Sequence, residues 1–83
     1  MYNILVVDDD KEIVKAIEIY LTKEGYNIIK AYDGEEALKV IKENEIHLVI
    51  LDIMMPNKDG IKTLAEIRKT KTIPVIMLSA KSE

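Results

Sequence analysis

The stretch "ILVVDDD" (residues 4–10) decides the fold class, because four branched apolar residues run directly into three aspartates. An unbroken apolar run is typical of a strand buried on both faces, as in a parallel sheet. Adjacent carboxylates at the end of such a strand repel one another and resist removal from water. Two explanations for the acids follow: they begin a helix, where the dipole favours negative charge, or they bind a cation.

The same pattern recurs along the chain. Apolar, strand-like runs occupy residues 2–7, 26–32, 46–54 and 73–78, and the segments between them have helical periodicity. This alternation predicts the order β-α-β-α-β-α-β, in which helical crossovers join parallel strands. We therefore expect one domain over residues 1–83, of the α/β class, with a doubly wound parallel sheet.

Local signals predict where the first helix begins and what it buries. Asp9 and Glu12 have the spacing of a capping box, and Gly25 stands where the helix should end. Gly60, in the loop after the third strand, is expected to adopt a backbone angle that other residues resist. The apolar residues of the first helix recur at the spacing of one helical face: Ile13, Ala16, Ile17, Tyr20 and Leu21.

Composition excludes several classes of function. The chain is 48% hydrophobic and 33% charged, lacks cysteine, and carries a net charge of −3 with a pI of about 5.2. No apolar run approaches the roughly 20 residues that span a bilayer, so no membrane partner is expected. The cations are scattered, which argues against nucleic-acid contact from this segment. A cysteine-free domain of this kind fits a cytoplasmic location.

Several polar residues stand at the ends of the predicted strands. In a parallel sheet these ends share one edge, where ligands bind. Asp8 and Asp9 follow the first strand, Asp52 lies near the end of the third, and Ser79 follows the fourth. Oxygen ligands without histidine or cysteine favour a hard cation such as Mg²⁺. An aspartate beside bound Mg²⁺ can attack phosphorus and form an aspartyl phosphate.

Four stretches together closely resemble the receiver domain of bacterial two-component response regulators, particularly those attached to winged-helix transcription factors. They agree with the family in identity, order and spacing: "ILVVDDD", "AYDGEEAL", "LVILDIMMPNKDGI" and "IPVIMLSA". The resemblance implies a flavodoxin-like sheet of order 2-1-3-4. It also implies a phosphoryl-accepting switch, charged by a sensor histidine kinase with Mg²⁺, that controls an output such as transcription. Such a switch is not a turnover enzyme.

The resemblance also assigns roles to individual residues. Asp52 would be the phosphoacceptor, with Asp8 and Asp9 as its acidic partners at the Mg²⁺ site. The backbone carbonyl of Met54 would be a further metal ligand. Two residues after the fourth strand would contact the phosphoryl group, through the Ser79 switch hydroxyl and the Ala80 backbone amide.

One departure from the family pattern lies at the end of the chain. Receivers continue through a fourth helix, a fifth strand that begins near an essential lysine, and a fifth helix, whereas this chain stops at Glu83. On this basis we expect a truncated receiver without an output domain, with reduced phosphorylation. An open edge on the fourth strand would allow homodimer formation.

Two other functions remain open at this point. An incomplete receiver could act only as a protein-interaction module. Asp8 and Asp10 also resemble the first motif of haloacid-dehalogenase-type phosphatases, in which Asp8 would be the nucleophile. The phosphatase interpretation leaves Asp52 and the loop after it unexplained, and substitution of either acceptor discriminates between the two hypotheses.

Overall fold

Four parallel strands form one sheet in the computed structural model, which describes residues 1–55 and 59–78. The strand order is β2-β1-β3-β4, and every neighbouring pair is parallel. The elements in chain order are β1 (Asn3–Val7), α1 (Lys11–Lys23), β2 (Asn27–Ala31), α2 (Gly34–Glu43), β3 (Leu48–Asp52), α3 (Asp59–Thr70) and β4 (Val75–Leu78). The predicted fold class, element order and strand order are confirmed.

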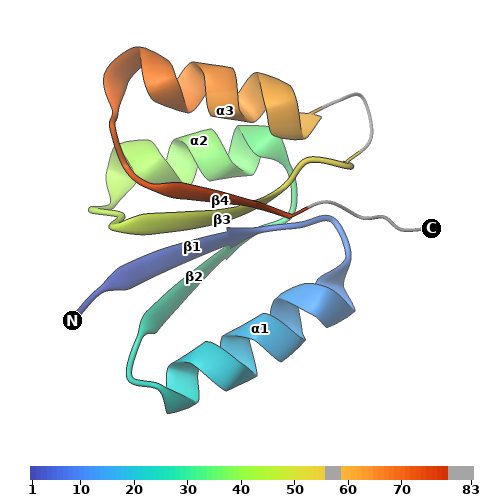
Figure 1. The fold of residues 1–83 in the computed structure, drawn as a ribbon, viewed down its shortest axis with the longest axis vertical. Coiled ribbons are helices and arrows are strands. Elements are labelled where there is room, and N and C mark those ends of the chain that lie inside the picture. The colour runs from blue at the N-terminus through green and yellow to red at the C-terminus, as the bar shows by residue number, and fades with distance from the viewer. Residues whose placement is uncertain (56–58, 79–83) are drawn as a thin grey trace.

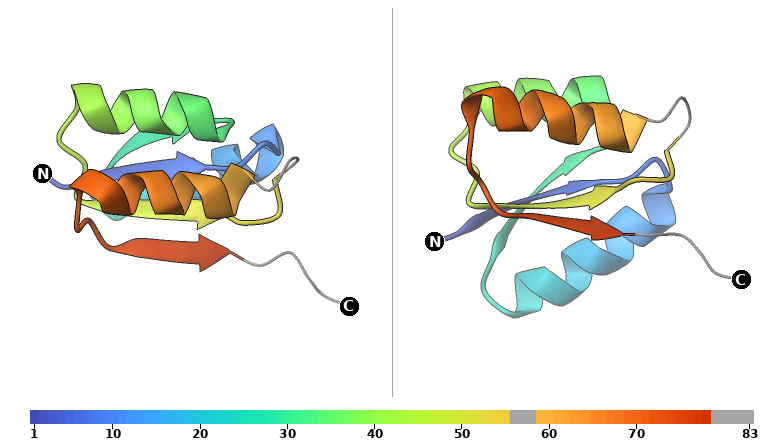
Figure 2. Two further views of the ribbon diagram at one scale, coloured as in Figure 1. Left: turned by 90° about the horizontal axis from the view of Figure 1, so that it is seen from above. Right: turned by 45° about the horizontal axis from the view of Figure 1, so that its top comes forward.

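Helices lie on both faces of the sheet, which explains why β1, buried on both faces, reads as a continuous apolar run. Figure 1 shows α2 and α3 on one face and α1 on the other, and Figure 2 shows the same layers from two further directions. Successive residues of β1 point to opposite faces. Leu5 and Val7 lie in the core under α2 and α3, whereas Ile4 and Val6 pack with Val14 of α1.

The cap of α1 differs from the sequence prediction. Asp10, not Asp9, is the N-cap residue: its backbone is extended, and its side chain accepts hydrogen bonds from the amides of Glu12 at 3.0 Å and Ile13 at 3.3 Å. The physical reason is that Asp10 is the residue whose backbone turns into the helix, and capping requires that geometry. Asp9 is thereby left outside the cap, beside Asp8.

The apolar face of α1 is only partly buried. Val14 is the fully buried residue of this helix, whereas Ile13 is 44% and Tyr20 66% exposed. The helix packs on β1 and β2, so the same face of β3 and β4 has no helix over it within the described residues. The remaining space is an apolar groove of about 370 Å³ lined by Ala16, Ile17, Tyr20, Leu21, Ile50, Ile76 and Leu78.

Candidate functional site

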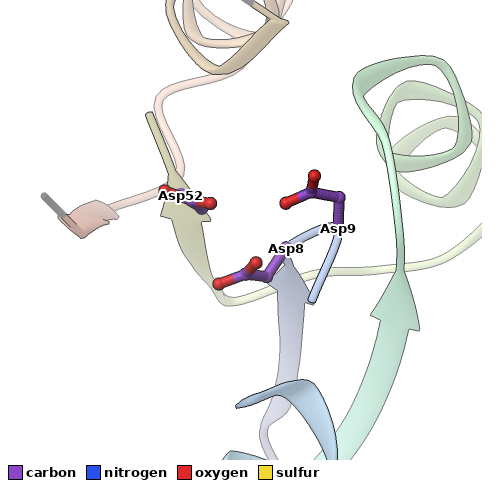
Figure 3. Close-up of side chains that lie close together, drawn as sticks. All are labelled: Asp8, Asp9 and Asp52. Carbon is purple, nitrogen blue, oxygen red and sulfur yellow. The ribbon is translucent and has the colours of Figure 1, made fainter. Parts of the chain in front are cut away.

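The pairing of β1 with β3 brings the aspartates of two strand ends together. Val7 is in register with Leu51, so Asp8 and Asp52 both follow paired residues at the same edge of the sheet. Figure 3 shows Asp8, Asp9 and Asp52 gathered there. One carboxylate oxygen from each of the three residues lies within 4.8 Å of the others.

Two of the three carboxylates are buried, and each is oriented by a nearby backbone amide. Asp8 is 4% and Asp52 9% exposed, whereas Asp9 is exposed. The amide of Asp10 donates to Asp8 Oδ1 at 2.9 Å, and the amide of Met54 donates to Asp52 Oδ1 at 2.9 Å. In both cases the donor lies two residues along the chain. The turns that follow β1 and β3 therefore orient the carboxylates of the strand ends.

The electrostatics of the cluster favour a proton or a cation. Burial raises the pKa of the Asp8 carboxyl above its usual 3.8. The hydrogen bond from the Asp10 amide lowers this pKa, but the nearby carboxylates of Asp52 and Asp9 raise it further. Within residues 1–55 and 59–78, none of the three carboxylates forms an ion pair. The cluster thus concentrates negative charge that the described protein groups leave uncompensated.

A hard divalent cation fits this donor set. The three candidate ligands offer oxygen only, and Mg²⁺ is bound in proteins by a few carboxylates together with water and substrate phosphate. One exposed carboxylate beside two buried ones leaves the site open to solvent on the Asp9 side. These features meet the requirements of a metal site that shares its ion with an incoming ligand.

The other site residues of the sequence analysis have different outcomes. Ser79 and Ala80 lie outside the described residues, so their roles stay predictions. The structure gives Met54 an amide hydrogen bond to Asp52, and a metal-ligand role for its carbonyl also stays a prediction. Asp10, which the phosphatase interpretation pairs with Asp8, is the N-cap of α1.

Gly60 has a different role from the one expected of it. Among the described residues only Gly25 has a positive φ, of 95°. The requirement at Gly60 is steric instead: a Cβ there would collide with the carbonyl oxygen of Asp52 and with Cα of Ile53. The sequence marks this glycine as special, but only the structure shows that it lies against the backbone of Asp52 and Ile53.

Comparison with known proteins decides the family. The model of the response regulator receiver domain matches residues 4–83, nearly the whole chain. The chain belongs to this family. Response regulator RR06 of Streptococcus pneumoniae is 50% identical over 78 residues, which are 94% of this chain and 36% of that protein. The transcriptional regulatory protein CpxR of Klebsiella pneumoniae is 47% identical over 81 residues, which are 98% of this chain and 34% of CpxR.

Solved receiver structures have the same fold. Response regulator TrrA of Thermotoga maritima, in complex with Mg²⁺-BeF, is 46% identical with a TM-score of 0.91 over 99% of this chain and 72% of TrrA. TrrA in complex with histidine kinase ThkA gives 45% identity and a TM-score of 0.90, over 100% of this chain and 72% of that chain. This receiver chain spans about a third of the length of its curated relatives. In its described part, no helix is both long and apolar enough to cross a membrane.

Proposed function

We propose that this receiver is a phosphoryl-accepting switch in which Asp52 takes a phosphoryl group from the phosphohistidine of a sensor histidine kinase. The observation that carries the proposal is the placement of Asp52 beside Asp8 and Asp9 at one edge of the sheet. A carboxylate oxygen of Asp52 would bond to phosphorus as the phosphorus–nitrogen bond of the donor breaks, and the histidine would leave with the bonding electron pair. The acyl phosphate holds the signal, so the domain acts as a switch and not as a turnover enzyme.

Mg²⁺ is the cofactor that we propose for this step. Asp8, Asp9, Asp52 and the Met54 carbonyl would hold it, and it would supply charge neutralisation between the carboxylates and the phosphoryl oxygens. Its presence with BeF in the structure of TrrA supports this assignment. Around the transferred group we propose the Ser79 hydroxyl and the Ala80 amide as further donors, from the family resemblance.

Metal removal tests the proposal. The sample is the longest natural chain that contains residues 1–83. Incubation with Mg²⁺ and a small acyl phosphate should add one phosphoryl group to it, which intact-mass measurement detects. Chelation of the metal should reduce the product to background, because two buried carboxylates beside Asp9 otherwise repel the anionic donor. Phosphorylation at the same rate in chelator would contradict the metal-dependent mechanism.

The partners and output are part of the same proposal. The complex of TrrA with ThkA supports a histidine kinase as the phosphodonor, and the name of CpxR supports a transcriptional output. The net charge of −3 argues against DNA contact by this segment, so we place any DNA contact elsewhere in the protein. We propose a cytoplasmic location. The phosphatase alternative is disfavoured because Asp10, which it needs as acid and base, caps α1 instead.

We also propose that the 83-residue chain pairs with a second copy through β4. This edge strand carries only apolar residues, with Ile76 50% exposed, whereas the opposite edge strand, β2, is protected by the charge of Lys30. The apolar groove beside β4 extends the same surface. Such pairing would also support the alternative function of a protein-interaction module.

Light scattering tests the pairing. We expect the molar mass of the 83-residue chain to rise toward twice the monomer value with increasing concentration. Ile76→Lys should return it to the monomer, because a charge on an edge strand opposes pairing. Ile61→Lys is the matched control, since Ile61 is 59% exposed on α3. A monomer at every concentration would contradict the proposal.

A further inference from the structure

Gly60, in the first turn of α3, lies against the end of the strand that carries Asp52. It is buried, and a Cβ at this position would collide with the Asp52 carbonyl oxygen and with Cα of Ile53. Both obstructing atoms belong to the backbone, so neither can move aside as a flexible side chain would. Any larger residue must therefore displace either the start of α3 or the end of β3, which lie close together in Figure 1.

Conformational freedom does not explain this glycine. Gly25, after α1, is the described glycine with a positive φ, and a Cβ there would meet no atom within 4 Å. The two glycines thus have opposite requirements: Gly25 needs an unusual backbone angle in open space, and Gly60 needs close contact between two backbones.

The backbone segment that Gly60 contacts is held from a second side and also orients the candidate acceptor. The amide of Ile53 donates to the carbonyl oxygen of Leu78 in β4 at 3.1 Å. The next amide, of Met54, donates to Asp52 Oδ1 at 2.9 Å. The peptide that joins Asp52 to Ile53 is therefore held between β4 and α3, and it leads directly into the turn that orients the carboxylate.

From this arrangement we infer that Gly60 is a positioning residue for Asp52: the close approach of α3 to the Asp52–Ile53 peptide fixes where the carboxylate lies relative to Asp8 and Asp9. The inference rests on the proposed function of Asp52 as phosphoacceptor. Gly60 touches neither metal nor phosphoryl group in this account and acts through the backbone. Loss of a group that orients a metal ligand typically weakens metal affinity 10- to 100-fold, so a displaced Asp52 backbone is expected to weaken Mg²⁺ binding about tenfold.

Gly60→Ala tests the inference against Ile67→Val as a matched control. Ile67 lies on the same helix and is 1% exposed in the core, so the shorter side chain weakens α3 packing without adding an atom next to Asp52. Three quantities are measured: the denaturation midpoint, the Kd for Mg²⁺ by calorimetry, and the amide NMR resonances of residues 52–54 without metal. We expect Gly60→Ala to shift the Ile53 and Met54 resonances and to raise the Kd for Mg²⁺ about tenfold. Ile67→Val should lower only the midpoint.

A Gly60→Ala protein with a lowered midpoint, but with wild-type Kd and resonances, would overturn the inference. The wild-type protein provides a second readout should that variant not fold. Titration with Mg²⁺ should shift the Gly60 amide with the same midpoint as the Met54 amide and leave the Gly25 amide unchanged. A Gly60 amide that does not respond would also overturn the inference. Absence of any Mg²⁺ binding by the wild type would instead contradict the proposed function on which the inference rests.

Discussion

Asp52→Asn is expected to reduce Mg²⁺-dependent phosphorylation to background. The amide of asparagine is not a nucleophile toward phosphorus, whereas its oxygen can still accept the hydrogen bond that Asp52 Oδ1 receives from the Met54 amide. The substitution also removes a charge that raises the pKa of Asp8, so the fold should be retained. Intact mass after incubation with an acyl phosphate measures the loss.

Asp10→Asn is the matched control for this experiment. It removes one negative charge from the same triplet, and asparagine caps a helix as well as aspartate does. Phosphorylation of this variant should therefore stay at the wild-type level. Retained phosphorylation in Asp52→Asn together with its loss in Asp8→Asn would favour the phosphatase interpretation and reject Asp52 as the acceptor.

Asp8→Asn is expected to have the second-largest effect, on metal binding. Loss of a residue that only orients a ligand typically weakens metal affinity 10- to 100-fold, and loss of a charged ligand should exceed that range. In the wild type, Mg²⁺ at about 100 times its Kd should add about 2.7 kcal/mol to the free energy of unfolding. We expect little of this stabilisation in Asp8→Asn at the same Mg²⁺ concentration, measured by denaturant unfolding with and without metal.

The same variant should have the opposite effect on the metal-free protein. Burial raises the pKa of Asp8 in the folded state above the 3.8 of the unfolded chain. The carboxylates of Asp52 and Asp9 add to this rise, and the hydrogen bond from the Asp10 amide opposes it. Protonated Asp8 therefore favours folding below pH 3.8, and that contribution is lost as the pH rises through the higher folded-state pKa.

Metal-free Asp8→Asn should consequently be more stable than wild type at neutral pH. Its side-chain oxygen can still accept the hydrogen bond from the Asp10 amide, so the turn after β1 should be preserved. The difference in the free energy of unfolding should shrink as the pH falls through the raised folded-state pKa of Asp8, and it should be smallest below 3.8. A variant that is less stable than wild type at neutral pH without metal would contradict the account of uncompensated charge.

The sequence predicts the fold correctly where several sequence signals indicate the same structure. "ILVVDDD" and "LVILD" (residues 48–52) each combine a buried strand with an acid at its end, and both strands lie where expected. The convergence of Asp8, Asp9 and Asp52 was predictable for the same reason, because parallel strands deliver their carboxyl ends to one edge.

The misassigned details depend on geometry that the sequence pattern does not contain. Three consecutive aspartates can each cap a helix, and the conformation of one residue selects Asp10. Helical periodicity identifies an apolar face on α1 but not what covers it, and Tyr20 on that face is 66% exposed. The loop pattern marks Gly60 as special, yet its close contact with the Asp52 backbone depends on how α3 packs against β3.

Locating the phosphoryl group tests the central claim most directly. The protein is phosphorylated with Mg²⁺ and an acyl phosphate, the acyl phosphate is trapped by reduction, and peptide mass mapping identifies the modified residue. The account predicts modification of Asp52 alone, because this buried carboxylate lies beside the acidic partners that would hold the metal. Modification of Asp8, or of any residue outside the cluster, would contradict it.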